Sequence, residues 1–409
     1  MHEMLCRYIR EHFPQTVKPA CEDNDTLIGL PFPYTTPCVS GMFQELYYWD
    51  TYFTNVGLLL SGMTEQAKHN VNNMISLIRR YGKMPNGNRT YYLNRSQPPF
   101  LSQMVRELFD ITHDLTWLSE DAYPALEKEY RFWTSHRGGK YGLNRYGCDL
   151  KNDADYLDIA SCFSERIQQP LPDDHAARIA WGKSMMALCE SGWDCTSRFA
   201  LDAHEHLPAD LNALLYLAET NMAYFAKALN RADEITVWNK RADARREAMT
   251  AFLWSEERQV FCDRSIATDK LNLTVSAAAF YPLFVGAATP AQAAQTVNAL
   301  PLLEHPHGIA CCEMRDGLLN LQWDHPHGWA CLHYIVICGL LRYGYKEDAK
   351  RIASKYTDTV AKNFALTGNL WEKYNVTDGT VSAAIEYDTP PMMGWTAGVF
   401  LYCEQLLTE

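Results

Sequence analysis

The sequence lacks any long run of apolar residues and any excess of positive charge. Because no stretch of 18 or more consecutive apolar residues occurs, the sequence predicts no membrane-spanning helix. The formal net charge is −12, which argues against nucleic acid and anionic membranes as partners. Both absences therefore argue against membrane-spanning and nucleic-acid-binding classes of protein.

The cysteines lack the spacing of a disulfide framework or a redox motif. The chain has 13 of them, scattered and without a C-x-x-C pair, and only Cys311 and Cys312 are adjacent. Cysteines scattered in this way are typically small, buried, apolar residues of a protein in a reducing compartment. The opening residues also lack an apolar stretch followed by small residues, so we expect no secretory signal in the sequence as given. The expected location is the cytoplasm.

A metal site is considered and disfavoured. The pattern H-P-H-G-x-A-C occurs twice, at residues 305–311 and 325–331. Histidines two positions apart do not share a helical face, and no H-x-x-x-H or C-x-x-C accompanies them. The favoured interpretation is two similar loop-to-helix junctions with a proline near the helix start. We expect no metal and no cofactor.

No alternation of strands and helices is visible, which disfavours a doubly wound sheet or a (β/α)8 barrel. Apolar residues instead recur at helical spacing, for example Ala67, Val71, Met74 and Ile78. We expect an all-α protein of about twelve helices in one domain spanning residues 1–409, with paired helices closed into a ring. The expected helix centres are near residues 57, 72, 104, 128, 182, 218, 243, 281, 296, 335, 355 and 400.

The loops between these helices combine aromatic rings with carboxylates, amides and arginines. They are residues 42–50, 84–99, 190–199, 322–329, 371–374 and 385–388. Aromatic faces with polar groups at their edges suit a sugar, which has an apolar C–H face and a rim of hydroxyls. The common alternative for any one ring, Trp323 included, is simple core packing.

Asp194 is the candidate general acid. It follows Trp193, and a carboxyl beside a large apolar ring is disfavoured in its charged form, so its pKa should rise. A raised pKa is what a general acid needs at neutral pH. The alternative is a helix cap, in which Asp194 accepts backbone N–H bonds.

Several long motifs resemble those of the trehalases of glycoside hydrolase family 37. Residues 40–52 match most of G-G-R-F-x-E-x-Y-x-W-D-x-Y, and Q-W-D-x-P-x-G-W is intact at 322–329. P-N-G-N-R-x-Y-Y-L-x-R-S-Q-P-P is intact at 85–99, and E-S-G-W-D at 190–194. E-K-Y at 372–374 and E-Y…G-W-T from 386 to 396 complete the set, in the family's order.

The resemblance implies an (α/α)6 barrel and inverting hydrolysis of an α-glucoside, with a small carbohydrate as the only implied partner and no indication of the oligomeric state. It implies Asp194 as the general acid and Glu386 as the general base. The resemblance and its intact motifs also indicate the positions for sugar binding. These are Phe43, Trp49, Asp50, Asn86, Arg95, Ser96, Gln97, Gly192, Trp193, Trp323 and Asp324.

The sequence departs from the family pattern on the leaving-group side. Met42 stands where the signature has arginine, and an arginine- and glutamate-bearing stretch of the family has no clear counterpart. The leading hypothesis is a trehalase-like hydrolase that cleaves trehalose or a related α-glucoside. We further expect trehalose to be a poor substrate relative to an α-glucoside with a less hydroxylated aglycone. Two other hypotheses stay open: a hydrolase for a less hydroxylated aglycone, and a sugar-binding relative without catalysis. Arg166 or Arg178 could also restore the missing cation.

Overall fold

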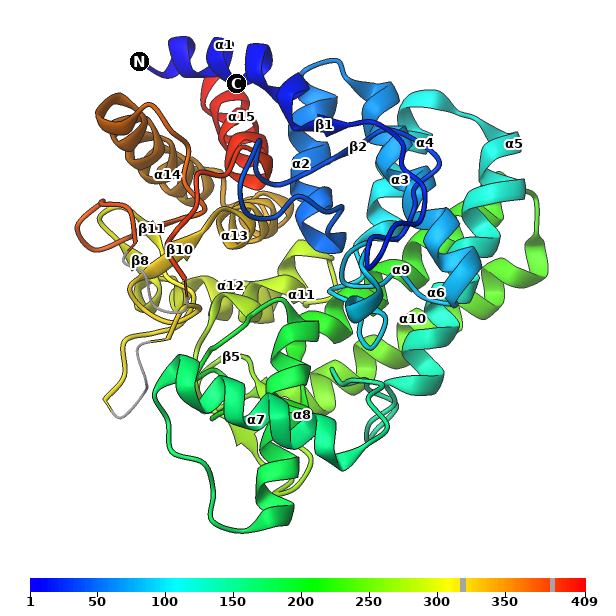
Figure 1. Ribbon diagram of the computed structural model, residues 1–409, viewed down its shortest axis with the longest axis vertical. Helices are drawn as coiled ribbons and strands as arrows, with labels where there is room; N and C mark the ends of the chain where they lie inside the picture. Colours follow the sequence, from blue (N-terminus) through cyan, green and yellow to red (C-terminus); the bar gives the residue numbers. More distant parts are fainter. Residues whose placement is uncertain (317–320, 383–386) are drawn as a thin grey trace.

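The computed structural model describes residues 1–316, 321–382 and 387–409, and helices dominate them (Figure 1). The α-helices are α1 (His2–His12), α2 (Tyr48–Leu60), α3 (Thr64–Tyr81), α4 (Leu101–Thr112), α5 (Leu115–Trp117), α6 (Tyr123–His136), α7 (Asp153–Ile167), α8 (His175–Ser191), α9 (Ala209–Ala228), α10 (Ala232–Leu253), α11 (Tyr281–Phe284), α12 (Pro290–Asn298), α13 (Ala330–Arg342), α14 (Lys346–Thr367) and α15 (Gly394–Thr408).

The strands are short and pair locally. They form the antiparallel pairs β1 (Val17–Lys18) with β2 (Tyr34–Thr35), β4 (Trp254–Ser255) with β5 (Val260–Phe261), β8 (Glu304–His305) with β9 (Gly308–Ile309), and β10 (His327–Trp329) with β11 (Lys373–Asn375). A three-stranded sheet has the order β3 (His206–Leu207), β6 (Asp263–Ser265), β7 (Leu271–Asn272).

The prediction of an all-α fold is confirmed, and each expected helix centre falls in or beside a helix of the structure. Helices α1, α5 and α7 were not predicted. For α7 the signal was present, because its buried residues Tyr156, Ala160, Phe163 and Ile167 keep helical spacing.

Six helices form a closed inner ring. Helix α2 contacts α4, α4 contacts α9, α9 contacts α11, α11 contacts α13, α13 contacts α15, and α15 returns to α2. Helices α3, α10 and α14 pack against members of this ring from outside. The inner α2, α13 and α15 are apolar almost all round, which explains why they are buried on every side. This ring of paired helices is the expected (α/α)6 barrel.

Helices α2 and α15 close the ring through glycine contacts. A Cβ built on Gly57 would lie 2.5 Å from the Cα of Gly398, and one on Gly398 would lie 2.1 Å from the backbone oxygen of Phe53. Since neither glycine has a side chain, the two backbones approach directly. Helices from the beginning and the end of the barrel thus lie side by side, blue and red in Figure 1.

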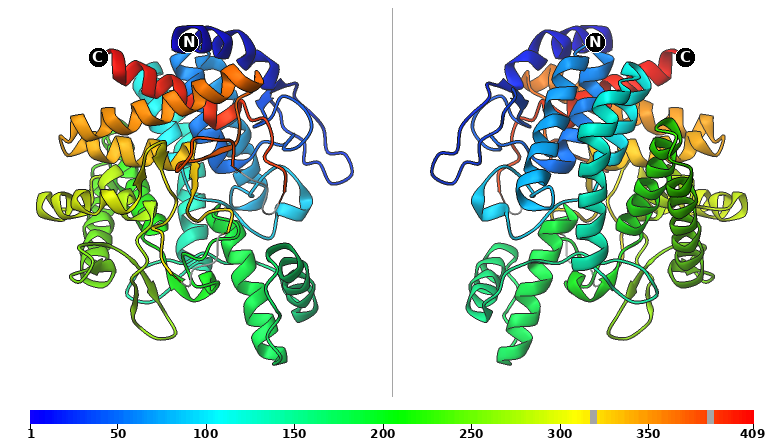
Figure 2. Two further views of the ribbon diagram at one scale, coloured as in Figure 1. Left: turned by 90° about the vertical axis from the view of Figure 1, so that its left-hand side faces the viewer. Right: turned by 90° about the vertical axis from the view of Figure 1, so that its right-hand side faces the viewer.

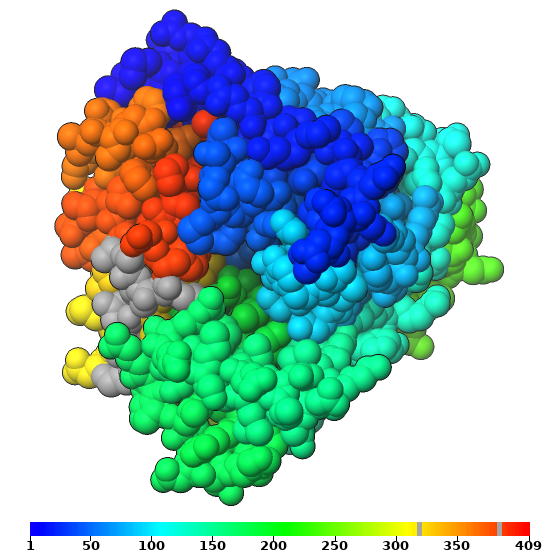
Figure 3. All heavy atoms as spheres, in the orientation of Figure 1, coloured from blue at the N-terminus to red at the C-terminus, as the bar shows by residue number. Residues whose placement is uncertain are grey.

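Loops from distant parts of the chain meet on one face of the barrel. Helices α7 and α8 pack on each other and extend from one side of the ring (Figure 2). The β10–β11 pair joins the segment around Trp329 to the segment around Lys373. Blue, green and red segments, far apart in sequence, converge on the face shown in Figure 3.

Candidate active site

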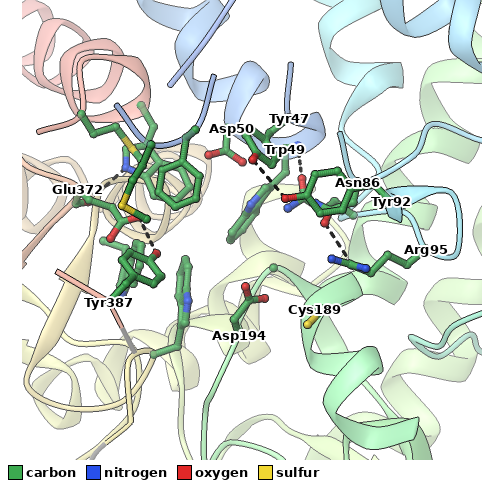
Figure 4. A pocket seen from close by; sticks show the side chains of 18 of the residues that line it. Tyr47, Trp49, Asp50, Asn86, Tyr92, Arg95, Cys189, Asp194, Glu372 and Tyr387 are labelled. Atoms are coloured by element: carbon green, nitrogen blue, oxygen red, sulfur yellow. Dashed lines mark hydrogen bonds between the residues drawn. The ribbon is translucent and has the colours of Figure 1, made fainter. Parts of the chain in front are cut away.

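A cavity of about 340 Å³ lies among these loops (Figure 4). The residues that line it are Met42, Phe43, Tyr47, Trp49, Asp50, Asn86, Tyr92, Arg95, Gln97, Arg166, Cys189, Gly192, Asp194, Trp323, Trp329, Glu372, Tyr387, Met392 and Trp395. Most of the predicted site residues are therefore brought together here, although they are spread over more than half of the chain.

Asp194 lies at the pocket because α8 ends just before it. Gly192 terminates α8 with φ of +74°, a conformation that favours glycine. Trp193 is fully buried beneath the turn, while Asp194 is half-buried at the pocket wall. The next helical turn has Asp202 at its N-cap position. Asp194 is at the N-cap position of none of the described helices, and it lies next to a buried indole. Its role as general acid stays a prediction.

Asp324 fixes the turn that follows Asp194. Its Oδ1 accepts hydrogen bonds from the Thr196 hydroxyl at 2.8 Å and the Ser197 N–H at 3.0 Å, and its Oδ2 accepts from the Leu321 N–H at 3.1 Å. The side chain is 3% exposed. Asp324 was predicted to bind substrate; it is not among the residues that line the cavity, and its hydrogen bonds hold the turn that follows Asp194.

Arg198 anchors the same turn in the core. It is fully buried, and its guanidinium makes paired hydrogen bonds to Asp210, at 2.9 Å, and to Asp263, at 2.7 Å. It also lies 4.6 Å from the ring centre of Trp193. A buried cation with two carboxylates is fully compensated, and removing one partner would leave an unpaired buried charge. The turn bearing Asp194 is therefore held from two sides.

Four tryptophans form one wall of the pocket. Trp323 stacks on Trp329 with ring centroids 3.7 Å apart, and Trp49 lies 5.5 Å from Trp323. Trp395 meets Trp329 edge-on at 5.5 Å. All four also line the cavity, so Trp323 belongs both to the core and to the pocket surface. A stacked aromatic wall suits the C–H face of a sugar ring.

The loop of residues 84–99 supplies fixed polar groups. Arg95 donates from Nε to the Oδ1 of Asn86 at 3.2 Å. The side-chain amide oxygen of Gln97 accepts from the backbone N–H of Trp49 at 3.3 Å. All three side chains reach the pocket. Ser96 points elsewhere: its hydroxyl donates to the Met84 carbonyl at 2.6 Å. Arg95 and Asn86 have donors to offer to sugar hydroxyls, whereas Ser96 supports the loop.

Asp50 is a second carboxyl in the pocket, on the first turn of α2. Burial raises its pKa to about 7, and the negative charge of Glu372 adds to the increase. Phe43, on the same stretch of chain, meets Tyr387 edge-on at 5.7 Å. Asp50 is thus poised between its charged and neutral forms near neutral pH.

Glu372 is a pocket carboxylate to which sequence analysis gave no role. It is 2% exposed, its Oε2 accepts from Lys373 Nζ at 2.8 Å, and its Oε1 accepts from the Tyr387 hydroxyl at 2.8 Å. It enters the pocket from a different side than Asp194 (Figure 4). Glu386, the predicted base, lies outside the described residues. The E-K-Y motif was the signal that could have singled out Glu372.

The prediction about the leaving group concerns Met42 and two candidate arginines, Arg166 and Arg178. Met42 lines the pocket and is 43% exposed. Arg166, near the end of α7, lines it as well. Arg178 instead donates to the Pro172 carbonyl at 2.6 Å. Of the two candidate replacements for the missing arginine, only Arg166 reaches this cavity in the described part of the chain.

Residues 1–316, 321–382 and 387–409 contain no group of three or more His, Cys, Asp or Glu side chains arranged to hold a metal ion. Within those same ranges, no helix has the length and apolar character needed to cross a membrane.

An all-α barrel whose loop end gathers facing carboxylates, a tryptophan wall and fixed polar donors defines a glycoside hydrolase of the (α/α)6 class. The trehalase family model matches residues 3–407. The chain belongs to the trehalase family, whose members are inverting hydrolases of glycoside hydrolase family 37.

Curated relatives and a solved structure support this membership of the trehalase family. A periplasmic trehalase of Xanthomonas axonopodis pv. citri is 34% identical over 92% of this chain and 68% of its own length. One of Escherichia coli is 32% identical over 92% of this chain and 69% of its own length.

Among solved structures, the neutral trehalase Nth1 from Saccharomyces cerevisiae is 28% identical with a TM-score of 0.77, covering 98% of this chain and 80% of that one. A GH63 mannosylglycerate hydrolase from Thermus thermophilus, 14% identical with a TM-score of 0.67 over 97% of this chain and 99% of that one, shares the fold.

Proposed function

We propose that the pocket hydrolyses the α-glucosidic bond of trehalose or a related α-glucoside, with the whole chain acting as one catalytic domain. Asp194 donates a proton to the leaving oxygen, and a carboxylate on another side activates the attacking water. The observation that carries the proposal is the meeting of Asp194, Asp50 and Glu372 around a tryptophan-walled cavity of about 340 Å³. Arg95, Asn86 and Gln97 hold the non-reducing glucose.

Two glutamates compete for the role of base. The resemblance implies Glu386, and we propose it as the base. Glu372 is the alternative, because it lines the pocket and accepts hydrogen bonds from Lys373 and Tyr387. If Glu386 is the base, Glu372 binds sugar hydroxyls.

Azide rescue separates the two glutamates. In the variant that lacks the base, azide occupies the position of the activated water; the C1–O bond breaks, Asp194 protonates the leaving oxygen, and azide forms the C1–N bond on the β face. We expect β-glucosyl azide from Glu386→Ala and none from Glu372→Ala. The opposite pattern would assign the base to Glu372. With the unsubstituted protein, NMR should detect β-glucose before mutarotation, because water attacks with inversion.

A hydrolase specific for a less hydroxylated aglycone is the second candidate. The observation that favours it is Met42 at the pocket wall, where an apolar chain offers no hydrogen bond to a second sugar. A panel of α-glucosides that includes trehalose tests both candidates at once, since only the aglycone differs.

We also propose a reducing, cytoplasmic setting, which buried thiols such as Cys311, Cys312 and Cys331 support. The relatives named above include proteins called periplasmic, so cell fractionation is the direct test. Recovery of the protein in the periplasmic fraction would contradict this proposal.

A further inference from the structure

A second cavity, of about 280 Å³, lies apart from the catalytic pocket. Its walls come from the end of α6, the loop of residues 145–153, the beginning of α7, the middle of α8 and the turn around His204. Arg145, Lys151 and Lys183 contribute positive charge to its lining, and Asp153 contributes one negative charge. A basic cavity stands out on a chain whose net charge is −12.

The cations of this cavity are only partly compensated. Arg145 reaches Glu205 at 3.4 Å, and that carboxylate is shared with His204 at 3.0 Å. Lys183 lies 5.5 Å from the ring centre of Tyr156. Throughout residues 1–316, 321–382 and 387–409, no carboxylate lies within ion-pair distance of Lys151 or Lys183. Lys151 is exposed and Lys183 is half-buried. A half-buried ammonium such as that of Lys183, with no counterion among the described residues, favours an anion nearby.

Arg137, which also lines the cavity, is a contrasting case. Its guanidinium donates to Glu190 at 2.6 and 2.9 Å and to Asp149 at 2.7 Å, so its charge is already matched. The excess positive charge therefore belongs to Arg145, Lys151 and Lys183. The pKa of His204 is lowered by burial and by the charges of Arg145 and Lys183, while Glu205 and Asp202 oppose this decrease.

We propose that this cavity binds a phosphoryl group, either as inorganic phosphate or as a small phosphate monoester. A guanidinium offers paired donors to phosphate oxygens, and lysines add mobile point charges. A volume of about 280 Å³ lies near the lower end of ordinary small-molecule sites, which fits a small phosphorylated metabolite. This site is separate from the glucoside pocket and does not depend on which glutamate is the base.

Calorimetric titration at constant ionic strength tests the proposal, with inorganic phosphate, glycerol 3-phosphate, glycerol and chloride as probes. We expect both phosphates to bind and glycerol and chloride to show no binding. Tighter binding of glycerol 3-phosphate would identify a monoester site, and tighter binding of inorganic phosphate a free-phosphate site. If neither phosphate binds more tightly than chloride, the proposal is wrong.

Lys183→Gln is the decisive variant, because Lys183 makes no ion pair whose loss would disturb the fold. We expect its Kd for the phosphate to rise about tenfold, the effect of losing one charge-assisted contact. Lys240→Gln, on the exposed face of α10, is the matched control and should bind like the unsubstituted protein. Lys151→Gln provides a second, surface-exposed test should Lys183→Gln fold poorly. Unchanged affinity in folded Lys183→Gln would overturn the assignment.

Discussion

Trp49 lies directly against Gly192, so that a Cβ built on Gly192 would lie 2.7 Å from the Cε2 of the indole. Trp49 belongs to the first turn of α2, and Gly192 is the residue that ends α8. Because Gly192 has no side chain, the segment of Asp194 can lie this close to α2 of the inner ring.

Gly192→Ala should lower kcat/KM strongly, because the new methyl group displaces either the indole or the acid's segment. Gly82→Ala is the matched control, since Gly82 also ends a helix with positive φ, of +84°, but its Cβ would meet no atom nearer than 3.9 Å. Both variants should lose thermal stability through backbone strain, Gly192→Ala more so because its methyl group also meets the indole, and Gly192→Ala should lose far more activity. Equal activity in the two variants would contradict the close fit.

Asp194→Asn should lower kcat on ordinary α-glucosides by about 10²–10⁴-fold, because the leaving oxygen is no longer protonated. α-Glucosyl fluoride, whose leaving group needs no proton, should retain far more of its rate. Steady-state kinetics with both substrates make the comparison. An equal loss for both would show that Asp194 acts by some means other than proton donation.

Asp50→Asn should stabilise the protein more at pH 8 than at pH 4. The folded-state pKa of Asp50 is raised to about 7, so the folded protein binds a proton at Asp50 more tightly than the unfolded chain does. Protonation of Asp50 therefore stabilises the folded state at low pH, and this stabilisation is lost as the pH rises from about 4 through 7. The difference in unfolding free energy between variant and unsubstituted protein should grow by up to about 4 kcal/mol over that range. Denaturant titrations measure it. Asp158→Asn, at an exposed position, is the control and should show no such trend.

Trehalose should be a poorer substrate than α-glucosides with small or apolar aglycones, because Met42 cannot hydrogen-bond a second glucose. Met42→Arg should raise kcat/KM for trehalose about tenfold, while leaving the apolar substrates little changed. Arg166→Gln shows how far Arg166 already supplies the missing cation. A value for trehalose of about 10⁵ M⁻¹s⁻¹ or more in the unsubstituted protein would overturn the inference from Met42.

Gly57→Ala should destabilise the fold by about 1–3 kcal/mol, because its Cβ would meet the backbone of α15 where the ring closes. Gly138→Ala is the control, since its Cβ would meet nothing nearer than 3.7 Å. Denaturant midpoints of the two variants give the comparison. A loss confined to Gly138→Ala would show that the ring closure tolerates the methyl group.

Much of this protein could be predicted from local pattern. Helical periodicity predicted the inner and outer helices, and the residue types around Asp194, Arg95 and Trp323 predicted a sugar site. The helix and family predictions are confirmed, because spacing along a helix decides which side chains share a face and because the intact motifs occur in a fixed order. The sugar site stays a prediction.

Other features depend on contacts between distant segments. Ser96 and Asp324 were predicted to bind sugar, but hydrogen bonds to Met84 and to the turn at Thr196 turn them toward the supporting structure. Neighbouring positions in a loop can face opposite ways, and sequence alone does not determine which way each one faces.

By itself, the sequence determined the class of fold, the family, and Asp194 as the candidate acid, since each follows from local spacing and residue type. Only the tertiary structure brought Glu372 to the pocket between Lys373 and Tyr387, and gathered Arg145, Lys151 and Lys183 around a second cavity. The physical reason is the closure of the ring, in which α15 packs against α2 and unites loops that the chain itself keeps far apart.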